Sequence, residues 1–131
     1  MNDLVQFLRN QYDIEASAAE NAAAETGADW HYDSKSGYVL GGRDHDMVAT
    51  GSQDFLEPSA GAHIARHDPA RVLREVEAKR RILAVHRPYV PEPDQACLGC
   101  AGGIQFQFCP VVRLLGLPYA DHPEYRDAWR P

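Results

Sequence analysis

The chain has 131 residues, of which 44% are hydrophobic and 24% charged, and it carries a formal net charge of −6. This length suits one modest domain with its own core, and the acidic total argues against non-specific binding of nucleic acid. No apolar run approaches a membrane span, and no signal peptide precedes the first expected helix. The metal-like spacing of the three cysteines suits a reducing compartment, so we expect a cytoplasmic protein. Since no apolar run is long enough to cross a membrane, we also expect no membrane binding.

Residues 1–28 are expected to form a helix, with its body over 3–25. Large apolar residues recur there at helical spacing: Leu4, Phe7, Leu8 and Tyr12. Beyond Ile14 this stripe fades into alanines, which favour a helix but bury little area. The stripe packs either inside its own chain or against a second copy across a two-fold axis. Internal packing is the plainer outcome, so a monomer is slightly favoured over a homodimer.

Residues 29–51 are expected to form a three-stranded antiparallel meander. Three short pieces rich in aromatic and β-branched residues, 30–32, 37–40 and 47–50, are separated by turns that contain glycine. We expect Trp30 and Tyr38 to supply its inner face. The meander covers one face only and needs a helix against it.

Residues 60–87 are expected to be helical, with a short helix over 60–66 and a long central helix over 68–86. Asp68 before Pro69 is a typical pairing of an N-cap with a first-turn proline. Apolar residues and one histidine then share a face: Val72, Leu73, Val76, Leu83 and His86. Pro88 ends the helix, so His86 lies in its last turn.

Charge is concentrated on this central helix. Residues 1–60 carry a net charge of −8, residues 61–87 carry +4, and residues 88–131 carry −2. A charge run of this kind is usually a solvated helix face. The alternative is that the basic helix over 66–87 binds an anion, contacts a partner or packs against the acidic N-terminal half.

Residues 88–131 form a cysteine-containing tail with the pattern His86-x10-Cys97-x2-Cys100-x8-Cys109. A C-x2-C pair turns two thiolates onto one ion, and the glycines at 99, 102 and 103 permit tight turns. Cys109 precedes Pro110 and is expected to cap a short helix over 110–117; a last helical turn is expected over 123–129. Three thiolates and one imidazole make a closed, structural type of zinc site.

Other interpretations of the cysteines remain open. A disulfide leaves one of the three thiols unpaired, a thioredoxin-like redox pair would open a helix, and buried unligated cysteines are common. The fourth zinc ligand is His86 or His122. His86 is preferred because it lies on the element that leads into the site.

Several segments carry a resemblance to known proteins: Trp30, Gly37–Val39, Met47–Ala49, His63–Leu73, Cys109-Pro110, and Pro118–Pro123 with Trp129. Together they resemble a family of small proteins from actinomycetes and their phages, a domain of unknown function. Residues 30–83 are also weakly similar to small phage accessory proteins. The resemblance covers nearly the whole chain and implies a fold shared by small accessory proteins. It assigns no catalytic residue.

The sequence therefore predicts a single α+β domain over 1–131, comprising an N-terminal helix, a meander, a long central helix and a zinc-stabilised tail with short helices. Its expected function is that of a non-enzymatic accessory protein that contacts another protein, since no phosphate loop, nucleophile elbow or HExxH is present. One alternative is nucleic-acid binding through the basic helix over 66–87. Another is a metal-dependent hydrolase built from Asp44-His45-Asp46 and His63, His67 and Asp68.

Overall fold

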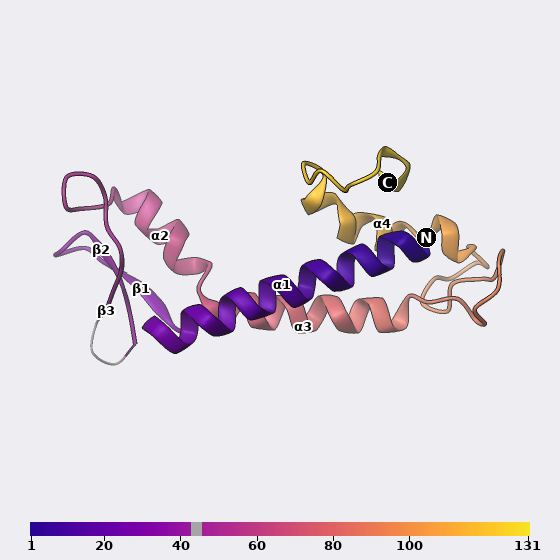
Figure 1. Cartoon of the computed structure of the whole chain (residues 1–131), viewed down its shortest axis with the longest axis horizontal. Coiled ribbons are helices and arrows are strands. Elements are labelled where there is room, and N and C mark those ends of the chain that lie inside the picture. The colour runs from indigo at the N-terminus through magenta and orange to yellow at the C-terminus, as the bar shows by residue number, and fades with distance from the viewer. Residues whose placement is uncertain (43–45) are drawn as a thin grey trace. The chain divides into compact units, whose positions relative to one another are not determined.

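The computed structural model describes residues 1–42 and 46–131 and confirms the α+β class. Its helices and strands follow in this order (Figure 1): α1 (Asn2–Thr26), β1 (Trp30–Asp33), β2 (Tyr38–Gly41), β3 (Asp46–Ala49), α2 (Pro58–Arg66), α3 (Pro69–Val85), the 3-10 turn η1 (Phe106–Phe108), α4 (Pro110–Gly116), and the 3-10 turns η2 (Leu117–Tyr119) and η3 (Asp127–Trp129).

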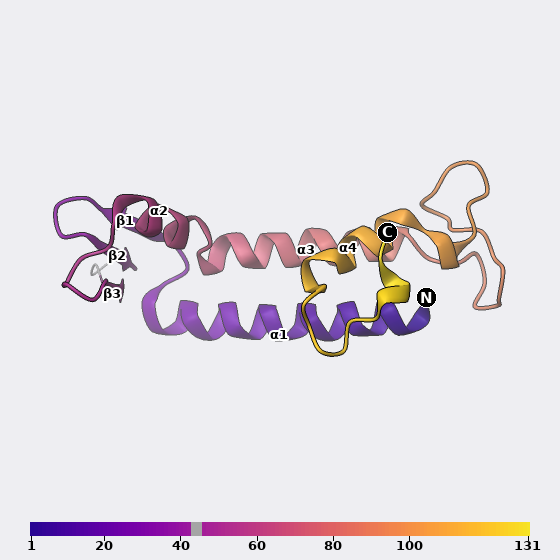
Figure 2. The same cartoon turned by 90° about the horizontal axis from the view of Figure 1, so that it is seen from above.

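The chain divides into two compact units whose boundaries fall inside the two long helices. Unit 1 comprises Met1–Tyr12 with Glu77–Pro131, and unit 2 comprises Asp13–Val76. In each unit a segment of α1 runs antiparallel beside a segment of α3 (Figures 1 and 2). The single domain expected over residues 1–131 stays a prediction.

Unit 2 contains the predicted antiparallel meander, with strand order β1-β2-β3. Tyr32 pairs with Val39 across β1 and β2, so their side chains share one face. That face is covered by α2: a side chain at Gly61 would collide with the Tyr32 ring, and Val39 is fully buried. Tyr38 lies on the opposite face, where its hydroxyl donates to Asp54 at 3.0 Å. The expected inner position of Tyr38 is therefore wrong, because successive strand residues alternate between faces.

The N-terminus of α3 is attached to β1 through the carboxylate of Asp68. One oxygen accepts a hydrogen bond from the Arg71 amide at 2.9 Å, which is the predicted N-cap. The other oxygen accepts one from the Trp30 amide at 3.1 Å. This second bond joins the helix to the sheet within unit 2.

The short helix α2 begins two residues earlier than expected, at Pro58. Proline suits this first helical position because its fixed φ is helical and its missing N–H would have no partner there. The helix start expected at residue 60 was therefore two residues too late.

Unit 1 buries the large apolar stripe of α1. Leu4, Leu8 and Tyr12 have no exposed surface, and Phe7 is 6% exposed. The Phe7 ring lies 5.3 Å from the ring centre of Trp129, and α4 approaches so closely that a side chain at Gly116 would lie 3.1 Å from Leu4. The internal packing expected for this stripe is confirmed, whereas the oligomeric state stays a prediction.

Candidate metal centre

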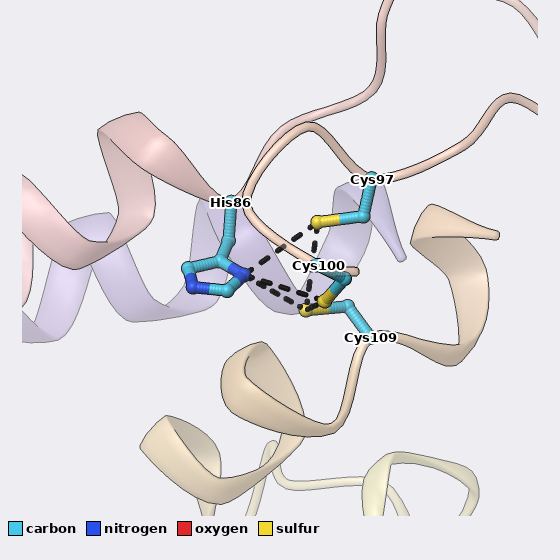
Figure 3. Close-up of side chains that lie close together, drawn as sticks. All are labelled: His86, Cys97, Cys100 and Cys109. Atoms are coloured by element: carbon cyan, nitrogen blue, oxygen red, sulfur yellow. Dashed lines mark hydrogen bonds between the residues drawn. The ribbon is translucent and has the colours of Figure 1, made fainter. Parts of the chain in front are cut away.

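Four side chains from three parts of unit 1 converge on one point (Figure 3). His86 follows the last residue of α3, Cys97 and Cys100 lie on the connection between the helices, and Cys109 is the residue before α4. Their candidate ligand atoms all lie within 4.8 Å of one another. The structure thus brings together the four residues that the spacing singled out.

The imidazole of His86 presents its Nδ1 atom to all three sulfurs. This nitrogen lies 3.4 Å from Cys109 Sγ and 3.6 Å from both Cys97 Sγ and Cys100 Sγ. The Cys109 sulfur lies 3.8 Å from that of Cys97 and 3.6 Å from that of Cys100. All three cysteines are free, since a disulfide needs sulfurs about 2.05 Å apart.

Backbone hydrogen bonds fix the start of the cysteine loop, which we define as residues 97–105. Cys97 forms an isolated antiparallel bridge with Pro88, and its amide donates to the Ile104 carbonyl at 2.8 Å. The Leu98 amide donates to the Arg87 carbonyl at 2.9 Å, so the loop is held beside the residue that follows His86. The Cys100 amide donates back to the Cys97 carbonyl at 3.2 Å, which closes the turn between the two thiols.

Gly99 has a role that sequence reasoning missed. A side-chain carbon at this position would lie 2.8 Å from His86 Nδ1 and 2.9 Å from Cε1 of the same ring. The sequence indicated only that a glycine permits a tight turn. The structure shows that the missing side chain also leaves space for the imidazole, a contact between distant residues with no local sequence signal.

Ile104, Phe106 and Phe108 alternate with glutamines, a pattern that predicts a one-face strand or an extended segment entering Cys109. The structure has no strand in this approach to Cys109. Residues 104–108 make only one antiparallel bridge, between Gln105 and Ala96, before the chain tightens into η1. The Cys109 amide then donates to the Phe106 carbonyl at 3.0 Å. The alternation of apolar residues and glutamines therefore did not make a strand, because the chain must turn to bring Cys109 to the cluster.

Cys109 is the predicted N-cap residue of α4, and it makes no side-chain capping bond. Its side chain is fully buried, and its sulfur is directed at His86 and the other two cysteines (Figure 3). The helix start therefore positions a candidate ligand atom and is not capped by that side chain.

The protein surroundings alone favour the neutral form of the Cys100 thiol. Burial, together with hydrogen bonds from Cys109 and Cys97 and the charges of their thiolates, raises the pKa of the Cys100 thiol to about 12. A cation among the sulfurs opposes this effect, because a coordinated thiol loses its proton. A donor set of three sulfurs and one imidazole nitrogen fits a soft or borderline divalent metal ion.

The alternative fourth ligand, His122, lies elsewhere in unit 1. Its Nδ1 accepts a hydrogen bond from the Glu124 amide at 3.1 Å, and its ring centre is 5.2 Å from that of Phe7. It packs against the α1 stripe and does not join the cysteines. The structure therefore favours His86, the preferred choice from the sequence.

The residues of the hydrolase alternative do not assemble into a centre within the part of the chain that the structure describes. The rings of His63 and His67 lie 4.4 Å apart, but the Asp68 oxygens accept the bonds from Trp30 and Arg71 described above. Asp44 and His45 lie outside the described residues. Among residues 1–42 and 46–131, the cluster of His86 with the cysteines is the one group of three or more potential ligands.

Comparison with protein families identifies a family of unknown function, DUF6221, whose model matches residues 1–131. The chain belongs to this family. Membership in DUF6221 confirms the resemblance to a domain of unknown function, while the actinomycete and phage origin stays a prediction. Neither the curated proteins nor the solved structures gave a match. Across the described residues, no helix of this DUF6221 member has the length and apolar character needed to cross a membrane.

Proposed function

We propose that this DUF6221 member is a non-enzymatic, cytoplasmic accessory protein that is stabilised by one zinc ion and acts by binding another protein. One observation carries the proposal: three sulfurs and one imidazole nitrogen from separate elements lie within 4.8 Å of one another. An actinomycete or phage setting, which the sequence resemblance suggested, is part of the same proposal.

Zinc suits this donor set better than the other common divalent ions. Calcium and magnesium prefer oxygen ligands, and here the four candidate donors are sulfur and nitrogen. Zinc binds Cys and His in tetrahedral structural sites of the Cys3His type. When bound, it would be held by His86, Cys97, Cys100 and Cys109, and it would supply a cross-link between the end of α3 and the start of α4.

The closed donor set supports a structural role rather than catalysis. A catalytic zinc keeps one coordination position for water or substrate, whereas four protein ligands fill a tetrahedral site. Two of these ligands, Cys97 and Cys109, are buried at 2% and 0% exposure. The arrangement therefore suits a cross-link that fixes the fold of unit 1.

Exposed apolar side chains support binding to another protein. Several large ones on the segment held by the cluster are open to solvent: Tyr89, Leu98, Ile104, Phe108, Leu114 and Leu117. Phe108 directly precedes the ligand Cys109 and is 60% exposed. Exposed aromatic residues of this kind are enriched at protein interfaces.

Elemental analysis of protein purified without a chelator tests the proposal. We expect one zinc per chain. Cys109→Ser should lose the metal, whereas His63→Ala should retain it because that histidine lies outside the cluster. Protein without metal and with all three thiols freely reactive would contradict the zinc site.

A further inference from the structure

We propose that the metal centre is a redox switch, in which a hydroperoxide oxidises Cys100, Cys109 closes a disulfide onto it, and the metal ion is released. The inference rests on the proposed zinc site and adds a regulation to it. It is carried by the unequal burial of the three cysteines, by the distances between their sulfurs, and by the backbone that holds each of them.

Cys100 is the cysteine that an oxidant in solution reaches first. It is the one partly exposed residue of the three, whereas Cys97 is 2% and Cys109 0% exposed. Oxidation of thiolates follows access as well as thiolate character. Metal coordination keeps Cys100 in the thiolate form, which is the nucleophilic form of the side chain.

Cys109 is placed to resolve the oxidised sulfur. Its Sγ atom lies 3.6 Å from that of Cys100, so a modest movement of the loop brings the two within bonding distance. Cys97 is held beside the end of α3 by its bridge to Pro88 and its bond to Ile104.

The loop beyond Cys100 has room for this movement. Gly102 and Gly103 have φ angles of +77° and +71°, and a side-chain carbon at either position would meet no atom within 4 Å. The space beside these two glycines is therefore open, whereas Gly99 lies against His86.

The chemistry balances with a hydroperoxide as the oxidant. The Cys100 thiolate attacks one peroxide oxygen, the O–O bond breaks, and a sulfenic acid and an alkoxide or hydroxide form. The Cys109 thiolate then attacks the sulfenic sulfur, the S–O bond breaks, and hydroxide leaves. Two electrons pass from the two sulfurs to the peroxide, and two protons from solvent neutralise the released anions.

Disulfide formation removes two of the four ligands. Cys97 and His86 alone would make an incomplete site for zinc, so a bound ion would be released. The disulfide would then join the loop to the start of α4 in place of the link between α3 and α4. A thiol reductant together with zinc should restore the original centre, because a disulfide, unlike a sulfinic acid, is reversible.

Treatment of the zinc-loaded full chain with hydrogen peroxide tests the switch. Released zinc is followed with a chromogenic chelator, free thiols are counted by alkylation, and the disulfide is mapped by mass spectrometry of peptides. We expect loss of the bound zinc, a fall from three free thiols to one, a Cys100–Cys109 bond, and recovery with reductant and zinc. His63→Ala, whose histidine lies outside the cluster, should respond in the same way.

The failures of the two proposals are distinguishable. Protein that never contains zinc overturns the proposed function. Protein that contains zinc but keeps both metal and thiols under peroxide overturns the switch alone. A Cys97–Cys100 disulfide, or oxidation of Cys100 to sulfinic acid without any disulfide, also overturns it, because the assigned partner would be wrong.

Discussion

At the scale of single residues, the candidate metal centre depends on an absent side chain as much as on its four candidate ligands. Gly99 allows the His86 ring to lie against the cysteine loop, since a side-chain carbon there would come within 2.8 Å of Nδ1. Sequence spacing finds ligands because metal chemistry limits their types. It does not find Gly99, because the contact joins residues that only the folded loop brings together.

We therefore expect Gly99→Ala to weaken zinc binding by about 10- to 100-fold, the usual effect of disturbing groups that orient a ligand. The added methyl group displaces the His86 ring from the three sulfurs. Competition with a chelator of known affinity measures the change. Gly102→Ala is the matched control, since its methyl group meets nothing within 4 Å although its φ of +77° is strained. Gly99 itself has no positive φ, so an equal or larger loss in Gly102→Ala would contradict the role of the ring contact.

A second prediction at this scale concerns Asp33, in the turn between β1 and β2. The Ser36 hydroxyl donates to its carboxylate at 2.6 Å, and this bond, followed by the amides of Ser36 and Lys35, lowers the pKa of Asp33 below its ordinary 3.8. A carboxyl whose pKa is lower in the folded state stabilises the fold above the unfolded pKa, and this contribution is lost as pH falls through the folded pKa.

Ser36→Ala should accordingly raise the pKa of Asp33 towards its ordinary value, and it should reduce the acid sensitivity of the turn. Titration of the carboxyl carbon by NMR measures the shift. Lys35→Ala should have a smaller effect, because its charge is the last of the causes that lower this pKa. A larger shift in Lys35→Ala than in Ser36→Ala would contradict the assignment.

At the scale of elements, the sequence predicted structure well wherever a local signal was sufficient. The apolar stripe, the Asp68-Pro69 start and Pro88 gave α1 and α3 within one or two residues. It failed at 104–108, where the alternation typical of a strand ended in η1. A strand needs pairing partners, and only one bridge forms there, because the chain turns towards the candidate metal centre.

Replacement of Asp68 tests the predicted start of α3 most directly. Asp68→Ala should cost about 1 to 2 kcal/mol of stability, since it removes an N-cap and also leaves the Trp30 amide without this acceptor. Asp68→Asn should cost less, because its amide oxygen still caps the Arg71 amide while its NH2 group faces Trp30. Urea denaturation measures both. Asp68→Ala with unchanged stability would contradict the dual role.

At the scale of the whole molecule, contacts between distant segments could not be predicted from the sequence. In unit 1, for example, the Arg113 guanidinium donates to the carbonyl oxygens of Gln107, Ala128 and Arg130 at 3.0–3.2 Å. These bonds attach the C-terminal segment to α4. An arginine on a short helix carries no sequence signal for such carbonyl partners, two of which come within reach only when η3 and the residue after it pack against α4.

The stripe of α1 left the choice between monomer and dimer open in the sequence, and its burial within unit 1 supports the monomer. Phe7 is 6% exposed, and its ring lies 5.2–5.8 Å from the ring centres of Tyr119, His122 and Trp129. An interface between two copies would need this side chain at the surface. We expect light scattering to give a mass near 14.6 kDa that stays constant as the protein is concentrated.

The same packing predicts that Phe7 matters for stability rather than for association. Phe7→Ala should cost about 3 to 5 kcal/mol, as is typical for a large buried side chain replaced by alanine, and the mass should remain that of one chain. Ile14→Ala on the same helix is the matched control: Ile14 is 60% exposed, so its replacement should change stability by less than about 0.5 kcal/mol. A doubled mass that Phe7→Ala returns to a monomer, with little loss of thermal stability, would instead place the stripe at an interface between two copies.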